Sequence, residues 1–290
     1  MNAGVTRCEL VRALAALAGP SPDAGLCRLL GLPPPPGAAS HTEVFVLEAH
    51  PYASVHLGAE GMLGGEACDR VAGFWRTLRI APPPEPDHLG VLLELYGRLG
   101  AEELALQTDA RRRAAVASAR GALYWEHLAP WAQVLLATVE RVGDRFHRAW
   151  AGLAGDVLAA EADALAPRAE LPSALAAAPP PLDATSRRDL LDALVAPVRI
   201  GMVITRADLV RAGRDLGLGV RRGERRFTLE GLFDQDPARV LAWLGGLAAE
   251  WAALHRRWHP GALEPVGRWW ADRARVAAEV LAAAAVRVAA

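Results

Sequence analysis

Cysteine, aromatic residues and lysine are scarce or absent in this sequence. The three cysteines, Cys8, Cys27 and Cys68, form no CxxC pair and lie in apolar, helix-like surroundings. This excludes a disulfide framework and favours buried thiols in a reducing compartment. Aromatic residues make up 6% and β-branched clusters are sparse, whereas alanine and leucine recur in long runs, so the composition favours helix almost throughout. Lysine is absent, which we attribute to codon bias.

An excess of either charge and a long apolar run are also missing. The net charge is -1 and the pI is about 6.7, which excludes a surface that coats nucleic acid or anionic lipid as a whole. Glu9 and Arg12 interrupt the apolar N-terminal stretch, and residues 276–290 are too short and too charged to span a bilayer. We therefore expect a cytoplasmic, soluble protein without membrane insertion.

The sequence lacks the common catalytic and nucleotide-binding motifs. It contains no GxxxxGK[ST], GxSxG or HExxH, and no GxGxxG between a strand and a helix. Residues 58–66 are rich in glycine but carry no lysine, which favours a turn between helices. The eight histidines are scattered, and no two are four residues apart with a carboxylate ligand between them. We predict a protein that is not an enzyme and has no cofactor or metal of its own.

Apolar residues instead recur at three- and four-residue spacing, with helix caps between the runs. Ser40 and Glu43 fit a capping box, and Ser186 and Thr205 each precede an aspartate by three residues. The pattern predicts an all-α protein, a compact multi-helix bundle with an additional C-terminal helical segment. Residues 167–184 are rich in proline and alanine. We therefore predict a helical core at 1–166, a linker at 167–184 and a C-terminal helical segment at 185–290, which could pack on the core.

Residues 81–88 carry four prolines, two acids and a histidine directly before an apolar helical pattern that runs to about Leu106. Asp87 is a short acceptor placed to cap this helix, and the prolines stiffen its approach. His88 would lie in the first turn, where the helix dipole disfavours its protonation. By itself, the stretch predicts a rigid helix start.

Two motifs extend this interpretation. The first is Glu85-Pro86-Asp87-His88 at the start of a helix, and the second is Trp125-Glu126-His127-Leu128-Ala129-Pro130-Trp131. Their order and surroundings, over about residues 40–160, resemble the TorD/DmsD/NarJ family of redox-enzyme maturation chaperones. Here the first motif lacks a spacer residue that some members have between proline and aspartate.

The resemblance implies a cytoplasmic, all-helical, TorD-like chaperone that assists molybdoenzyme assembly. Such a protein binds the signal peptide, often a twin-arginine (Tat) signal, or the N-terminal segment of a molybdopterin oxidoreductase catalytic subunit. It assists cofactor loading and maturation before export or assembly. The partner is then this catalytic subunit and its signal peptide. The protein itself would be a monomer or a helix-swapped dimer.

The resemblance also implies which residues bind the peptide. Carboxylates beside an apolar groove suit a segment with two guanidinium groups and an apolar stretch. Ordinary core packing is the alternative for the apolar members, and aromatic residues at helical spacing usually pack internally. The predicted peptide-binding residues are Glu85, Asp87, His88, Trp75, Leu78, Tyr52, Leu92 and Tyr96. The predicted structural supports of the groove are Tyr124, Trp125, His127 and Trp131.

A DNA-binding regulator is the alternative function. Residues 205–232 contain a helix, a glycine-containing turn and a basic cluster, an arrangement that suits a helix-turn-helix. A solvated basic loop is the simpler interpretation, and the near-neutral net charge favours it, so nucleic acid is not the expected partner. The same side chains could instead contact an acidic client surface or a molybdopterin phosphate. The cluster comprises Arg221, Arg222, Arg225 and Arg226.

Overall fold

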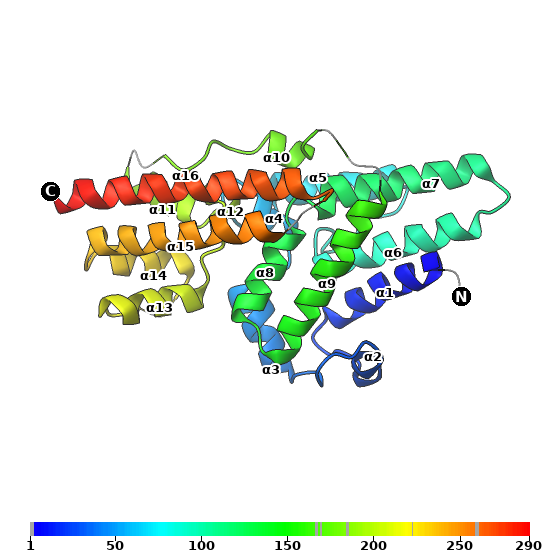
Figure 1. Cartoon of the computed structure of the whole chain (residues 1–290), viewed down its shortest axis with the longest axis horizontal. Coiled ribbons are helices and arrows are strands. Elements are labelled where there is room, and N and C mark those ends of the chain that lie inside the picture. The colour runs from blue at the N-terminus through cyan, green and yellow to red at the C-terminus, as the bar shows by residue number, and fades with distance from the viewer. Residues whose placement is uncertain (1–2, 166–167, 169, 184–185, 222, 259–260) are drawn as a thin grey trace. The chain divides into compact units, whose positions relative to one another are not determined.

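The computed structural model describes residues 3–165, 168, 170–183, 186–221, 223–258 and 261–290. Throughout these residues the chain folds into helices joined by turns, and no strand occurs among them (Figure 1). The single β-bridge in this part of the chain joins Tyr52 and His88. The predicted all-α fold is confirmed. Among the described residues, no helix combines the length and apolar character that a membrane span requires.

The chain forms two compact units. We call Met1–Ser54 with Leu63–Ala174 the N-unit, and Val55–Met62 with Leu175–Ala290 the C-unit. The chain therefore leaves the N-unit after Ser54, contributes eight residues to the C-unit, and returns at Leu63. The predicted domain boundaries near residues 166 and 185 stay predictions.

The N-unit consists of α-helices and two π-helical segments. Three of them begin at an aspartate cap: the carboxylates of Asp23, Asp109 and Asp144 accept backbone N–H groups in the first turns of α2, α7 and α9. The α-helices are α1 Ala3–Leu17, α2 Ala24–Leu29, α3 Ala38–His41, α5 Gly65–Thr77, α6 Leu89–Ala105, α7 Ala110–Ala122, α8 Ala132–Val142 and α9 Arg145–Ala164. The π-helices are η1 Thr42–Glu48 and η2 Leu123–Leu128. Two short helices, α4 Ala53–Leu57 and α10 Ser173–Ala176, begin in the N-unit and continue into the C-unit.

The predicted cap at Ser40 is wrong. Gly37 precedes α3, and Ser40 lies within that helix. The Ser40 hydroxyl instead donates a hydrogen bond to Asp144, the residue that caps α9. The Ser40 hydroxyl therefore bonds to a residue far along the chain, whereas the local pattern predicted that it would cap its own helix.

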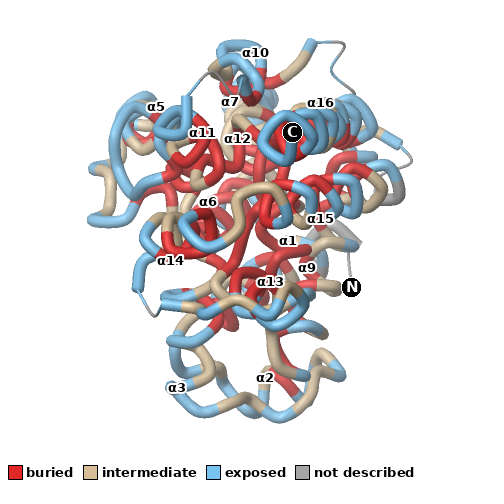
Figure 2. Tube along the Cα trace, turned by 90° about the vertical axis from the view of Figure 1, so that its left-hand side faces the viewer, coloured by how far each residue is buried: buried red, intermediate tan, exposed pale blue. Residues whose placement is uncertain are grey.

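Close packing of α1 on α6 organises the N-unit, and the two helices lie side by side in Figure 1. Two glycines of α6 permit this approach: a Cβ at Gly97 would lie 2.4 Å from Cγ of Arg12, and one at Gly100 would lie 2.5 Å from Sγ of Cys8. Behind α1, the indole of Trp150 on α9 is fully buried and donates to the Leu14 carbonyl at 3.1 Å. Figure 2 shows the resulting buried stripes along these helices.

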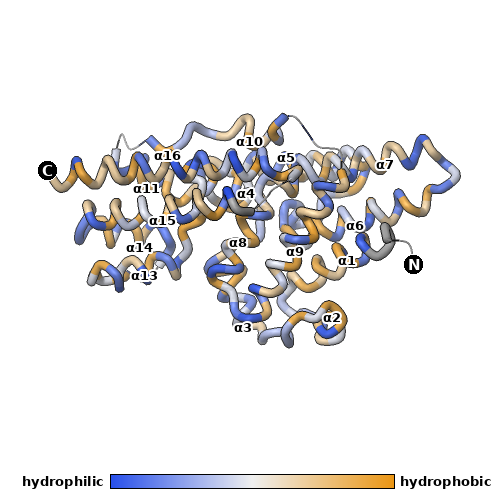
Figure 3. Tube along the Cα trace, viewed as in Figure 1, coloured by the Kyte–Doolittle hydropathy of each residue, from blue (hydrophilic) through white to orange (hydrophobic). Residues whose placement is uncertain are grey.

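The C-unit is built around the long helices α15 (Pro237–Trp258) and α16 (Glu264–Ala289), which pack along one another. Gly201 approaches α16 so closely that a Cβ would lie 2.2 Å from the backbone nitrogen of Ala274. The remaining helices are α11 Arg187–Leu194, α12 Pro197–Ile200, α13 Arg206–Leu216 and α14 Arg225–Phe233. Figure 3 shows apolar and hydrophilic residues alternating around these helices, as amphipathic packing requires.

The predicted caps in the C-unit are confirmed. Ser186 accepts the backbone N–H of Asp189 at the start of α11. Thr205 and Asp208 form a reciprocal capping box at the start of α13. Within the proline- and alanine-rich stretch, Leu182 is buried and its N–H donates to the Arg199 carbonyl at 3.0 Å. This part of the stretch thus packs onto the C-unit's own helices.

Candidate functional site

The Glu85–His88 motif joins the start of α6 to the segment before α4. The Leu89 N–H donates to the Pro51 carbonyl at 2.8 Å, and the Ala53 N–H donates to the Asp87 carbonyl at 3.1 Å. These bonds flank the Tyr52–His88 bridge. The motif is therefore held by backbone pairing to residues more than 30 positions earlier in the chain.

Asp87 completes this joint with its side chain. It is only 3% exposed, and its carboxylate accepts the Ser54 N–H at 2.9 Å, in the first turn of α4. Burial, followed by the nearby Asp87 carboxylate, raises the pKa of the Cys68 thiol to about 11. The prediction that Asp87 caps the following helix is wrong. The cap of α6 is His88, whose Nδ1 accepts the Gly90 N–H at 3.1 Å.

Two more predicted residues bond to the motif. The Tyr52 hydroxyl donates to the exposed Glu85 carboxylate at 2.8 Å, and burial together with this bond raises the pKa of Tyr52 to about 12. The Trp75 indole donates to the Pro86 carbonyl at 3.2 Å. The structure thus brings five of the predicted residues into one cluster: Tyr52, Trp75, Glu85, Asp87 and His88. The polar groups of these residues bond mainly to one another and to the nearby backbone.

A pocket of about 420 Å³ opens beside this cluster, within the N-unit. Its walls come from α5, the proline-rich loop, the first three turns of α6 and the end of α1. Of the predicted peptide-binding residues, Trp75 and His88 line it. The full lining consists of Ala15, Gly19, Trp75, Ala81, Pro83, His88, Gly90, Val91, Glu94, Leu95 and Arg98.

The lining is mostly apolar, with charge confined to α6. Burial lowers the pKa of His88, so its imidazole is neutral at pH 7. Glu94 and Arg98 are the charged residues of the lining, and sequence reasoning missed both. Their signal was present, because residues 91, 94, 95 and 98 share one face of a helix that begins at the motif.

Leu92 and Tyr96 do not reach the pocket. Leu92 is fully buried, and Tyr96 is 2% exposed. Leu78, at the end of α5, is half-buried and lies outside the pocket lining. Leu92 and Tyr96 therefore belong to the core. Core packing was the alternative prediction for the apolar residues.

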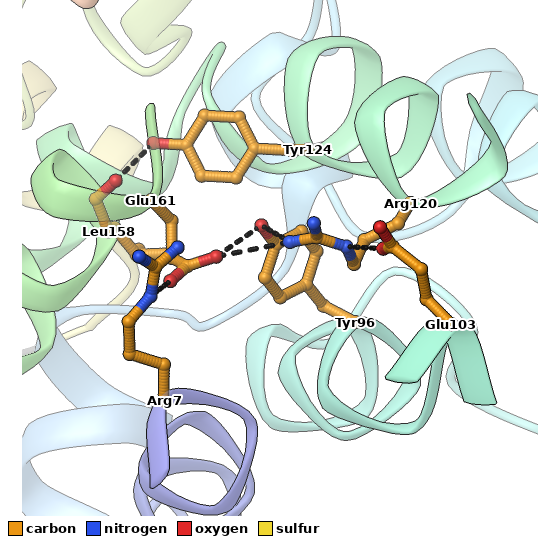
Figure 4. A network of polar contacts seen from close by, with 7 residues as sticks. All are labelled: Arg7, Tyr96, Glu103, Arg120, Tyr124, Leu158 and Glu161. Atoms are coloured by element: carbon orange, nitrogen blue, oxygen red, sulfur yellow. Dashed lines mark hydrogen bonds and ion pairs between the residues drawn. The ribbon is translucent and has the colours of Figure 1, made fainter. Parts of the chain in front are cut away.

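Tyr96 belongs to a polar network that ties α1, α6, α7 and α9 together (Figure 4). At its centre is Glu161, 3% exposed, which accepts from the Tyr96 hydroxyl at 2.7 Å, from Arg7 at 2.6 Å and from Arg120 at 3.2 Å. Arg120 also donates to Glu103 at 2.9 Å. Nearby, the Tyr124 hydroxyl donates to the Leu158 carbonyl.

The second motif lies in η2 and the turn after it, and most of its residues are buried within the N-unit. Trp125 and Trp131 are buried, and the Trp131 indole donates to the His127 carbonyl at 2.7 Å. The His127 ring packs against Phe74 at 4.8 Å between centroids, and burial lowers its pKa to about 4. Phe74 precedes Trp75 on α5, so this motif packs against the helix that forms one wall of the pocket. Its predicted supporting role stays a prediction.

The basic cluster of the C-unit is partly neutralised. Arg226 forms ion pairs with Asp192 and Glu230, and Arg225 donates to the Ile204 carbonyl. The Arg221 guanidinium lies 6.0 Å from the centre of the Phe227 ring. Arg222 lies outside the described residues. The cluster therefore makes internal contacts, which favours the solvated loop over a DNA-reading surface.

Residues 37–137 match the family described as nitrate reductase delta subunit. This is a family of redox-enzyme maturation chaperones, which bind molybdoenzyme subunits. The match contains both motifs, and the resemblance indicated by those motifs is thereby confirmed over this range. No curated protein and no solved structure gives a significant match to the chain. In the part of the chain that the structure describes, no group of three or more His, Cys, Asp or Glu residues is arranged to hold a metal ion.

Proposed function

We propose that this protein is a cytoplasmic maturation chaperone for a molybdopterin oxidoreductase. It binds the signal peptide or N-terminal segment of the catalytic subunit in the pocket between α1, α5 and α6. It holds that segment while the cofactor is loaded, before export or assembly. The pocket beside the motif, with Trp75 and His88 in its wall, is the observation that carries this proposal.

The size and lining of the pocket suit a short peptide segment. Ligand pockets of roughly 300–1,000 Å³ enclose a few side chains, and an apolar lining with few polar groups provides affinity with limited directionality. A chaperone needs that combination, because it must hold its client and later release it. The half-buried Val91 supplies apolar surface along one wall, with Leu95 buried behind the surface, and Pro83 stiffens the proline-rich loop.

The motif itself acts as a positioning device. Asp87 is buried and engaged by the Ser54 N–H, and His88 Nδ1 is engaged by the Gly90 N–H. Side chains that bond to the protein's own backbone in this way can fix the geometry of a pocket wall. We therefore assign Asp87 to the support of the pocket, and His88 and Trp75 to contact with the peptide.

Filling the pocket tests the proposal. The probes are fluorescein-labelled N-terminal segments, about 25 residues long, of the molybdoenzyme catalytic subunits encoded in the same genome. Ala81 is exposed and lines the pocket, so Ala81→Trp should block it and weaken binding at least tenfold in fluorescence polarisation. Ala101 is also exposed but lies outside the lining, so Ala101→Trp is the control. Equal binding by both variants would remove the pocket from the proposal.

The maturation role needs a separate measurement. A client expressed with and without this protein should differ in molybdenum content, measured by mass spectrometry of the purified client. Molybdenum content that does not depend on the chaperone would contradict the loading role, even where the peptide binds. Light scattering of the same preparations would decide between the predicted monomer and the helix-swapped dimer.

A further inference from the structure

The charges of the pocket lie one helical turn apart on α6. Glu94 and Arg98 have the i, i+4 spacing, so both side chains project from the same face of the helix. With the acid on the N-terminal side, this is the favourable order for an ion pair within a helix. An isolated α6 would be expected to pair these two residues.

Glu94 pairs with α1 instead. Nε of Arg12 lies 3.2 Å and 3.3 Å from the two carboxylate oxygens of Glu94. Gly97 makes this possible, because a Cβ there would lie 2.4 Å from Cγ of Arg12. The stem of Arg12 therefore crosses α6 over a glycine to reach the carboxylate.

Arg98 is therefore left without Glu94 as a partner. It is exposed and lines the pocket, and its guanidinium forms no hydrogen bond or ion pair with any residue that the structure describes. Since Arg12 neutralises Glu94, the uncompensated charge of the lining is the Arg98 guanidinium. The acids of the motif do not alter this balance, because neither Glu85 nor Asp87 lines the pocket.

We propose that the pocket selects client segments that carry an acidic side chain beside their apolar residues. Arg98 is the specificity-determining residue, since a guanidinium and a carboxylate form strong, often bidentate hydrogen bonds. Arg12 is a positioning residue, which holds Glu94 away from Arg98 without touching the peptide. This inference rests on the proposed function and narrows it, because the predicted twin-arginine signal would meet a cation in the pocket.

Three synthetic probes test the selection. They share one apolar sequence of about ten residues and differ in a pair of residues that is Glu, Gln or Arg. At low salt the wild-type protein should bind the Glu probe about two- to fivefold more tightly than the Gln probe, the range expected for one exposed ion pair. The Arg probe should bind most weakly, and the differences should shrink as salt is raised.

Variants then identify the residues responsible. Arg98→Gln should abolish the preference for the Glu probe. Arg12→Gln should abolish it too, because Glu94 is then free to pair with Arg98. The double variant Arg12→Gln/Glu94→Gln should restore the preference, a rescue that a merely structural role for Arg12 would not produce. Arg113→Gln, an exposed arginine on α7 outside the pocket, is the charge-matched control.

Other results would overturn the inference. Tightest binding of the Arg probe, lost in Glu94→Gln, would make the carboxylate the selecting group. Equal binding of all three probes, weakened by Ala81→Trp, would remove charge selection while the peptide-binding function stands. Failure of every probe and of the client segments would reject the function together with the inference.

Discussion

At the scale of single residues, the buried Glu161 is the centre of a polar network in the N-unit. Its buried carboxylate receives two guanidinium groups and one hydroxyl (Figure 4). Glu161→Gln would leave the mostly buried Arg120 without this counter-charge, so we expect a loss of roughly 2–4 kcal/mol in the free energy of unfolding. The Glu102–Arg112 pair is much more exposed, and Glu102→Gln should cost less than about 1 kcal/mol. Urea denaturation of both variants measures the contrast, and equal losses would contradict it.

His127 should make stability depend on pH. Its pKa in the folded protein is about 4 because burial disfavours the charged ring, whereas an unfolded histidine titrates near 6.5. Below pH 6.5 the unfolded chain gains a proton that the folded chain does not, so stability is lost as the pH falls from 6.5 to 4. The contribution is about 3 kcal/mol. His127→Phe should flatten the stability curve in this window, and an unchanged slope in chemical denaturation would refute the assignment.

Asp87 shows why residue-level roles were only partly predictable. A short acceptor before an apolar helix is a good local signal for a cap, and Asp87 does lie directly before α6. The carboxylate nevertheless bonds to Ser54, 33 residues earlier. Rules that consider three or four neighbouring residues cannot include such a partner. The backbone pairing of residues 51–53 with 87–89 determines this choice, and it follows from the tertiary fold.

At the scale of elements, α6 shows the same limit in another form. Its predicted extent, His88 to about Leu106, agrees with the observed Leu89–Ala105. The predicted groove residues on this helix are Leu92 and Tyr96, whereas the pocket lining contains the neighbouring Val91 and Leu95, of which Leu95 is only 2% exposed. One residue turns a helix by about 100°. Because α6 is apolar on several sides, spacing alone cannot determine which stripe meets solvent.

The contact between α1 and α6 depends on glycine. Gly97→Ala would push Cβ against Cγ of Arg12 and towards the Cys8 carbonyl, so we expect a loss of about 1–3 kcal/mol. Gly121 on α7 has open space around its Cα, so Gly121→Ala should instead stabilise the protein by about 0.5–1 kcal/mol, because alanine is the better helix former. Thermal unfolding of the two variants should therefore shift in opposite directions. A shared direction would show that the α1–α6 contact adapts without cost.

At the scale of the whole molecule, the family match covers most but not all of the pocket. The matched residues 37–137 include both motifs, and they explain why the class of protein could be predicted from sequence. The pocket also uses Ala15 and Gly19, and Arg12 controls its charge, yet all three lie on or just after α1, outside the match. The chaperone function we propose therefore rests on the matched region, while the charge selection we propose needs Arg12, which lies outside the match, together with Glu94 and Arg98, which lie inside it.

The C-unit depends on a distant piece of the chain, Val55–Met62, and Gly61 is its most constrained residue. Gly61 has φ of 63°, and a Cβ there would lie 2.1 Å from the Val195 carbonyl oxygen. Gly61→Ala should therefore cost about 3 kcal/mol or more, since backbone strain and overpacking add. Gly31 has φ of 68° and open space, so Gly31→Ala isolates the strain and should cost about 1 kcal/mol. Hydrogen exchange should show faster opening of α11 and α12 in Gly61→Ala only, because Val195 lies between these two helices. Equal exchange in both variants would mean that the inserted segment does not stabilise the C-unit.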